Sequence, residues 1–178
     1  MAHDEPLPVL GFVATSGTGK TTLLTRLLPL LKARGLRCGV VKHSHHDFAI
    51  DIPGKDSYRL REAGADQVML ASPHRMFLVE ERDGLSEPEL PTLLARLDRD
   101  GLDLVLVEGF SRARVPKIEL FRRSLGLPRR CDGDPDLIAV ATDDEASLDE
   151  VDGVPSLPLN DPDAVADFIA AWLLAARS

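Results

Sequence analysis

Aromatic residues are scarce in this sequence, at 4% of the chain, so its core has to be built mostly from Leu, Val, Ile and Ala. Cysteine is scarce too: Cys38 and Cys131 stand far apart and match no zinc or redox spacing. The apolar run CGVV around Cys38 predicts a buried free thiol, and a reducing cytosol is the simpler setting for such a chain.

Long apolar runs are missing, since none approaches the roughly 20 residues of a membrane span. The first residues, MAHDEPLP, are acidic and contain proline, unlike a signal peptide, so we expect a cytoplasmic protein. Basic residues are the minority, with 21 Lys and Arg against 29 Asp and Glu, which argues against a broad nucleic-acid-binding face. A small anion site made of backbone amides and one lysine remains compatible with this charge.

What is present is an alternation of short apolar runs, typical of buried strands, with segments of helical periodicity. The predicted strands cover residues 7–14, 36–42, 67–71, 76–80, 102–107, 118–121 and 137–141, and the predicted helices cover 21–34, 56–63, 90–97 and a segment beginning at 161. This order predicts an α/β fold with a mainly parallel sheet flanked by helices. The 178 residues suit a single NTP-binding domain spanning 1–178.

A glycine-rich segment follows the first predicted strand and matches the Walker A spacing G-x-x-x-x-G-K-[ST], except that Ala14 replaces the first glycine. Its glycines let successive amides turn toward phosphate, Lys20 supplies a charge, and the Thr21 hydroxyl can bind Mg²⁺. The predicted nucleotide-binding residues of this loop are Ser16, Gly17, Thr18, Gly19, Lys20, Thr21 and Thr22. The alternative is an ordinary Gly/Ser/Thr-rich turn, but a buried strand before it and a leucine-rich helix after it favour a P-loop.

A second acidic motif ends the strand predicted at 102–107, where Glu108 precedes Gly109. An acid at this place in a P-loop protein can hold Mg²⁺ or orient a water molecule, which makes Glu108, with Lys20, a candidate catalytic residue and, with Thr21, a candidate metal ligand. The alternative is a surface glutamate at a strand end.

Three further segments narrow the class: VKHSHHD at 41–47, PGKDS at 53–57 and VEGF at 107–110. Together with SGTGKTT at 16–22, and in this order, they resemble the MobB family of molybdopterin-guanine dinucleotide biosynthesis adapter proteins. The resemblance covers the chain from Leu10 to the final helix.

This resemblance implies a GTP-binding protein of the SIMIBI class of P-loop NTPases, similar in fold to dethiobiotin synthetase. It implies GTP and Mg²⁺ as ligands, a homodimer, weak GTP hydrolysis, and a guanylyltransferase partner that joins GMP to molybdopterin. Molybdopterin itself is a second candidate ligand.

The resemblance also places Lys42 near phosphate or a bound partner, and Thr142 and Asp143 where related NTPases bind the base. An aspartate can accept hydrogen bonds from guanine N1–H and N2–H₂, although the sequence lacks the full N-K-x-D motif. The histidines His43, His45 and His46 are candidates for contacting phosphate, and a transition-metal site is the weaker alternative because no second ligand cluster is visible.

Two charged groups have competing interpretations. Asp51, Lys55 and Asp56 form either a loop that senses the γ-phosphate or a charged surface turn. Basic residues after VEGF, at Arg112, Arg114 and Lys117, either bind an anion or are solvated.

Two other functions fit the same fold. A small-molecule kinase or ATP-dependent ligase would need a residue placed to activate an acceptor, which the sequence does not identify. A non-catalytic module would use the nucleotide only to regulate docking.

Overall fold

The computed structural model describes residues 7–44, 48, 50–82, 84, 86–144, 150–151 and 153–176. The chain forms two compact units: Met1–His43 together with Leu90–Ser178, and Ser44–Glu89. The single functional domain expected over residues 1–178 stays a prediction. None of the helices in these described ranges is long and apolar enough to span a membrane.

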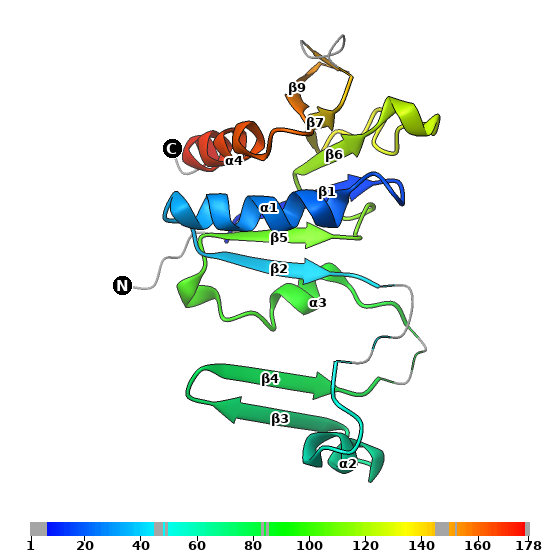
Figure 1. The fold of residues 1–178 in the computed structure, drawn as a ribbon, viewed down its shortest axis with the longest axis vertical. Helices are drawn as coiled ribbons and strands as arrows, with labels where there is room; N and C mark the ends of the chain where they lie inside the picture. Colours follow the sequence, from blue (N-terminus) through cyan, green and yellow to red (C-terminus); the bar gives the residue numbers. More distant parts are fainter. Residues whose placement is uncertain are drawn as a thin grey trace. The chain divides into compact units, whose positions relative to one another are not determined.

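The larger unit contains a seven-stranded sheet in the order β2-β5-β1-β6-β7-β9-β8 (Figure 1). Its strands are β1 Val9–Ala14, β2 Cys38–Lys42, β5 Leu104–Glu108, β6 Lys117–Phe121, β7 Leu137–Thr142, β8 Glu150–Val151 and β9 Val154–Pro158. Every neighbouring pair is parallel except β8 and β9. The predicted α/β class with a mainly parallel sheet is therefore confirmed.

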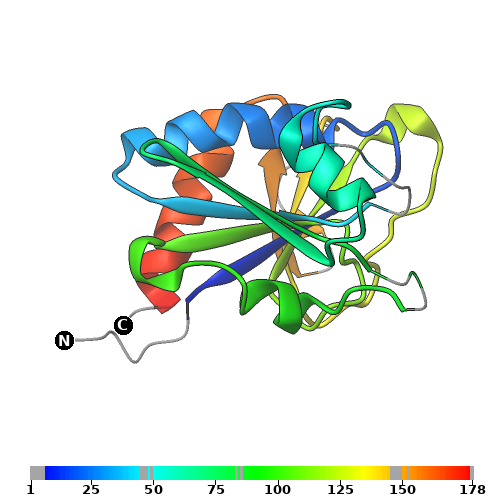
Figure 2. The same cartoon turned by 90° about the horizontal axis from the view of Figure 1, so that it is seen from below.

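Helices α1, Lys20–Ala33, and α4, Pro162–Ala176, lie side by side on one face of this sheet (Figure 2). Alternate β5 residues point to opposite faces, so Leu104 and Leu106 join the core under α1 and α4. Val105 and Val107 pack with the other face, which is covered by α3, Leu90–Leu94. Both faces of the sheet are buried, which is why its strands read as continuous apolar runs.

The ends of the helices follow local sequence signals. Asp161 accepts hydrogen bonds from the amides of Asp163 and Ala164 and so caps the N-terminus of α4. Pro29 lies inside α1 without ending it. Two short 3₁₀ turns, Arg99–Gly101 and Arg123–Leu125, complete the larger unit's helical segments in the part of the chain described.

The smaller unit contains helix α2, Asp56–Glu62, and a hairpin of β3, Gln67–Ser72, and β4, Arg75–Glu80 (Figure 1). Polar contacts connect its parts: the buried Ser57 hydroxyl donates to Asp51, 2.9 Å away, and Arg61 pairs with Glu81 at 2.5 Å. Asp51 and Ser57 therefore have a structural role within this unit, and the γ-phosphate-sensing role of 51–56 stays a prediction.

The sequence did not predict β8 or β9. Pro155 and Pro158 lie in β9, and proline is a signal against a strand because it cannot donate to a neighbouring strand. The helix predicted at 90–97 is shorter, since α3 ends at Leu94.

Candidate functional site

The candidate site lies at the carboxyl edge of the large sheet, where parallel strands end together. Strand β1 is central, with β5 and β2 on one side and β6, β7 and β9 on the other. Such a switch in strand order opens a crevice beyond the strand ends in open α/β sheets. Lys42, Glu108 and Thr142 are the last residues of β2, β5 and β7, so all three lie at this edge.

The predicted phosphate loop connects β1 to α1. Gly17 and Gly19 have φ angles of +84° and +98°, which side chains with a Cβ rarely adopt, and Gly19 is the residue that caps α1. The buried Thr18 donates its hydroxyl to the Thr15 carbonyl at 2.8 Å, which braces the loop from inside. With no acidic residue in its first turn, α1 presents an uncompensated positive end to the loop.

Three predicted residues converge on one oxygen of Glu108. Its Oε1 lies 3.4 Å from the Thr21 hydroxyl, 3.9 Å from Lys20 Nζ and 3.4 Å from Lys42 Nζ. The register explains part of this, because Lys42 stands directly opposite Glu108 in the β2–β5 pair. Glu108 is mostly buried, and a buried charge needs a partner. The two ammonium groups beside the loop compensate it.

This arrangement fits Mg²⁺ bound by Thr21 and Glu108. Both residues supply oxygen atoms, the ligand type that Mg²⁺ prefers, and these two atoms lie 3.4 Å apart. Two protein oxygens are also sufficient, because Mg²⁺ usually completes its shell with phosphates and water. Within the described ranges, no group of three or more His, Cys, Asp or Glu residues could hold a metal.

The VEGF segment holds His43 beside this cluster. The His43 amide donates to the Glu108 carbonyl at 2.8 Å, and its ring stacks on Phe110 with 5.0 Å between the ring centres. Gly109 has a φ angle of +100°, and a Cβ there would lie 3.0 Å from the His43 Cβ. His43 is therefore fixed at the strand end, whereas His45, His46 and Asp47 lie outside the described residues.

On the other side of the loop, Thr142 ends β7 and Asp143 follows it. Thr142 is buried and its hydroxyl accepts from the Asp144 amide at 3.1 Å, which shapes the turn. Asp143 accepts from Arg122 Nη1 at 2.9 Å. The Asp143 carboxylate thus has a protein partner at the place where the sequence predicts base recognition.

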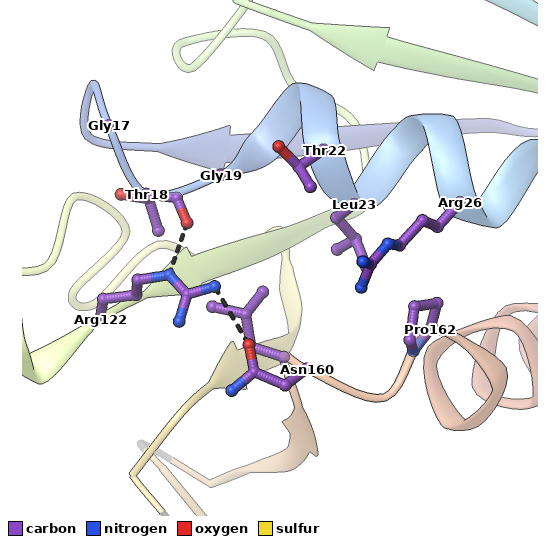
Figure 3. A pocket seen from close by; sticks show the side chains of 10 residues that line it. Gly17, Thr18, Gly19, Thr22, Leu23, Arg26, Arg122, Asn160 and Pro162 are labelled. Carbon is purple, nitrogen blue, oxygen red and sulfur yellow. Dashed lines mark hydrogen bonds between the residues drawn. The ribbon is translucent and has the colours of Figure 1, made fainter.

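A pocket of about 190 Å³ lies beside the phosphate loop (Figure 3). It is lined by Gly17, Thr18, Gly19, Thr22, Leu23, Arg26, Arg122, Leu159, Asn160 and Pro162. Four of the predicted loop residues are among them. The sequence did not single out Arg26, Arg122 or Asn160 as site residues. The position of Arg122 directly after strand β6 is the sequence feature that could have identified it as a site residue.

Two of the three basic residues after VEGF have structural partners. Lys117, only 2% exposed, pairs with Asp134 at 2.7 Å and donates to the Ser111 carbonyl at 3.3 Å. Arg114 pairs with Asp136 at 3.1 Å. The hydrogen bond from Lys117 lowers the pKa of Asp134, with a further contribution from the Asp136 amide. For Lys117, burial inside the fold replaces the anion-binding role considered from sequence.

Buried Glu119 holds the segment after β6 from within. It accepts from Arg129 Nε at 2.9 Å and from the amides of Arg130 and Cys131. The Cys131 thiol beside it is buried, and burial raises its pKa to about 11. These contacts anchor the chain that begins at Arg122.

Several known proteins are similar to this chain in sequence. A family model described as MobB, molybdopterin guanine dinucleotide synthesis protein B, matches residues 9–143. The chain is 47% identical over 174 residues to the molybdopterin-guanine dinucleotide biosynthesis adapter protein of Escherichia coli (strain K12), covering 97% of each. It is 42% identical over 170 residues to the protein of that name from Haemophilus influenzae, covering 96% of this chain and 92% of the relative.

A solved structure of molybdopterin-guanine biosynthesis protein B (mobB) has the same fold, with a TM-score of 0.68 and 30% identity. The alignment covers 92% of this chain and 99% of that one. Together with the sheet order, this similarity confirms the fold class predicted from sequence.

Proposed function

Since the chain belongs to the MobB family, we propose that it is an adapter in molybdopterin-guanine dinucleotide biosynthesis and that it binds GTP with Mg²⁺. The observation that carries the nucleotide part is the convergence of Lys20, Thr21 and Lys42 on Glu108 beside the phosphate loop. The adapter part is supported by the similarity to relatives of that name over nearly the whole chain.

The triphosphate binds across the N-terminus of α1. Amides of the loop and the helix end donate to phosphate oxygens, as at other helix N-termini that hold anions. Lys20 adds a full charge to the β- and γ-phosphates, and Lys42 approaches them from the end of β2. This local positive charge offsets the acidity of the chain as a whole.

Thr21 and Glu108, whose side-chain oxygens lie 3.4 Å apart, would hold Mg²⁺. The ion supplies charge compensation between phosphate groups when it is bound. Glu108 then acts as an anchor for cations. Its Oε1 lies 3.9 Å from Lys20 Nζ and 3.4 Å from Lys42 Nζ, so the carboxylate is engaged in two ion pairs. The resemblance to the family implies weak GTP hydrolysis.

The partner is the guanylyltransferase that joins GMP to molybdopterin, and molybdopterin is a second candidate ligand. We place the protein in the cytoplasm as a homodimer. These assignments rest on the family and on the resemblance of the sequence motifs, and the geometry of the nucleotide site is compatible with them.

The test is calorimetric titration of the purified protein with GTP and with ATP, each with Mg²⁺. Tighter binding of GTP supports the proposal. The same preparation is then added to a guanylyltransferase reaction, with Lys20→Ala protein as the matched control. Equal binding of the two nucleotides, or a preference for ATP, would move the function toward a kinase or ligase. GTP binding without any effect on the reaction would leave a nucleotide-binding module and remove the adapter role.

A further inference from the structure

Arg122 connects three segments that are far apart in the sequence. Its Nε donates to the Thr18 carbonyl at 2.8 Å, its Nη1 to Asp143 at 2.9 Å, and its Nη2 to Asn160 Oδ1 at 3.1 Å. These acceptors belong to the phosphate loop, the segment after β7 and the segment after β9. Figure 3 shows Arg122 between Thr18 and Asn160, with both hydrogen bonds drawn.

The chemistry of arginine suits this connection. The guanidinium group is planar and presents its N–H groups in fixed directions, so it holds its acceptors at set positions relative to one another. The bond to Asp143 joins two charged groups, which makes it stronger than a neutral hydrogen bond. The Arg122 and Asp143 side chains are 28% and 20% exposed, so solvent screens the pair only in part.

Asn160 lines the pocket beside the predicted phosphate loop, and we take this pocket as the site of the nucleobase of the proposed GTP. The pocket begins at the phosphate loop, and Leu23, Leu159 and Pro162 give it apolar walls. Nucleotide pockets combine such walls with a few polar groups that fix orientation. Figure 3 shows Leu23 of α1 opposite Asn160 across this space.

The bond from Arg122 also sets which way the Asn160 amide points. Because Oδ1 accepts from Arg122, the amide nitrogen remains as the donor for a ligand. Guanine offers two acceptors along one edge, O6 and N7, whereas adenine has an amino donor in place of O6. N7 accepts in both bases, so the discrimination comes from position 6, where the Asn160 amide donor meets an acceptor in guanine and an amino donor in adenine.

We propose that Asn160 selects guanine in this pocket. Arg122 is the positioning residue, because it fixes the Asn160 side chain relative to the phosphate loop. Asp143 acts through Arg122. Among the described residues, it orients the guanidinium and is not part of the pocket lining. This inference rests on the proposed binding of GTP and assigns its base specificity to residues beyond the sequence motifs.

The test measures the dissociation constants of GTP, ATP and inorganic tripolyphosphate, each with Mg²⁺, for the full chain. Asn160→Ala and Arg122→Lys are expected to lower the preference for GTP over ATP about 10-fold, because a hydrogen bond of about 1.4 kcal/mol is lost. Tripolyphosphate, which has no base, should bind these variants and the wild type alike. Arg123→Lys, at a neighbouring arginine that is 74% exposed, is the control and should leave the preference unchanged.

A double variant that combines Asn160→Ala with Arg122→Lys distinguishes a positioning role of Arg122 from a general structural role. If Arg122 acts through Asn160, Arg122→Lys adds little to the loss of preference already caused by Asn160→Ala. A purely structural role for Arg122 would instead weaken GTP, ATP and tripolyphosphate together, and that result would overturn the proposal.

Xanthosine triphosphate distinguishes the role of Asp143. If Asp143 contacted the base directly, Asp143→Asn would gain affinity for xanthine, whose C2 carbonyl accepts from an amide. We expect no such gain, and a gain would overturn the indirect role. A wild type without GTP preference would refute the proposed function itself, whereas GTP preference retained in Asn160→Ala would refute this inference alone.

Discussion

The hydroxyl of Thr21 lies 3.4 Å from the Oε1 atom of Glu108, although 87 positions separate the two residues in the chain. One residue opens helix α1 and the other ends strand β5, so the carboxyl edge of the sheet brings them together. The same carboxylate oxygen lies near the ammonium groups of Lys20 and Lys42.

Lys20→Ala is expected to lower the affinity for GTP at least about 10-fold, because a charge-assisted bond to phosphate is lost. The side chain is not part of the apolar core, so the midpoint of thermal unfolding should stay within roughly 3 °C. Lys32→Ala, at an exposed lysine in the last turn of α1, is the matched control. Unchanged GTP affinity in the Lys20 variant would remove the phosphate-loop assignment.

Glu108→Gln is expected to abolish most of the increase in GTP affinity that Mg²⁺ produces. Without Mg²⁺, the variant should bind GTP as well as the wild type or better, since Lys20 and Lys42 lose a competing carboxylate. Calorimetric titration in Mg²⁺ and in chelator measures both effects, and Glu89→Gln at an exposed position is the control. A normal response to Mg²⁺ in the variant would show that Glu108 does not hold the ion.

Asp134→Asn is expected to lower the free energy of unfolding at pH 7 by about 3 kcal/mol, because it leaves the buried Lys117 without its charged partner. The folded-state pKa of Asp134 is lowered by the Lys117 hydrogen bond. Its stabilising effect is therefore complete above the unfolded value of about 3.9 and is lost as the pH falls through the folded value.

Denaturant titrations from pH 7 to pH 2 measure this dependence. Wild type and Asp134→Asn should become similar in stability at the acid end. The exposed pair of Asp167 with Arg34 provides the control, and Asp167→Asn should cost much less stability than Asp134→Asn. A difference between wild type and Asp134→Asn that is constant over the whole pH range would contradict the ion-pair explanation.

Gly109→Ala is expected to destabilise the protein more than Gly35→Ala. Both glycines have positive φ angles, so both substitutions impose a strain of about 1–2 kcal/mol. Only at Gly109 does the new Cβ also meet the His43 backbone and Cβ at 3.0 Å, whereas no atom lies within 4 Å at Gly35. Equal losses in urea unfolding would show that the contact with His43 adjusts freely.

The phosphate side of the site could be predicted from the sequence for a definite reason. Lys20 and Thr21 belong to a contiguous motif, and Glu108 ends a strand whose apolar run is unambiguous. Parallel strands end at a common edge, so the predicted fold class alone places Glu108 near the loop. The roles of these residues in binding nucleotide stay predictions.

The opposite side could not be predicted in the same way. Strand β9 carries two prolines, which concealed it, and Asn160 gains its place only because that strand pairs with β7. The sequence suggested that Lys117 is solvated or binds an anion. In the structure Lys117 is buried and forms an ion pair with Asp134. Neither the position of Asn160 nor the burial of Lys117 is indicated by a periodic pattern in the sequence.

The sequence by itself determined the class of the fold, and it predicted the phosphate loop and the acid that faces it, because these depend on local propensity, apolar periodicity and a contiguous motif. Only the tertiary structure decided that Arg122 joins the loop to Asp143 and Asn160. Its three hydrogen bonds connect residues up to 104 positions apart, and the pairing of loops across a sheet depends on strand order and register. Those are properties of the packed chain, which no short segment encodes on its own.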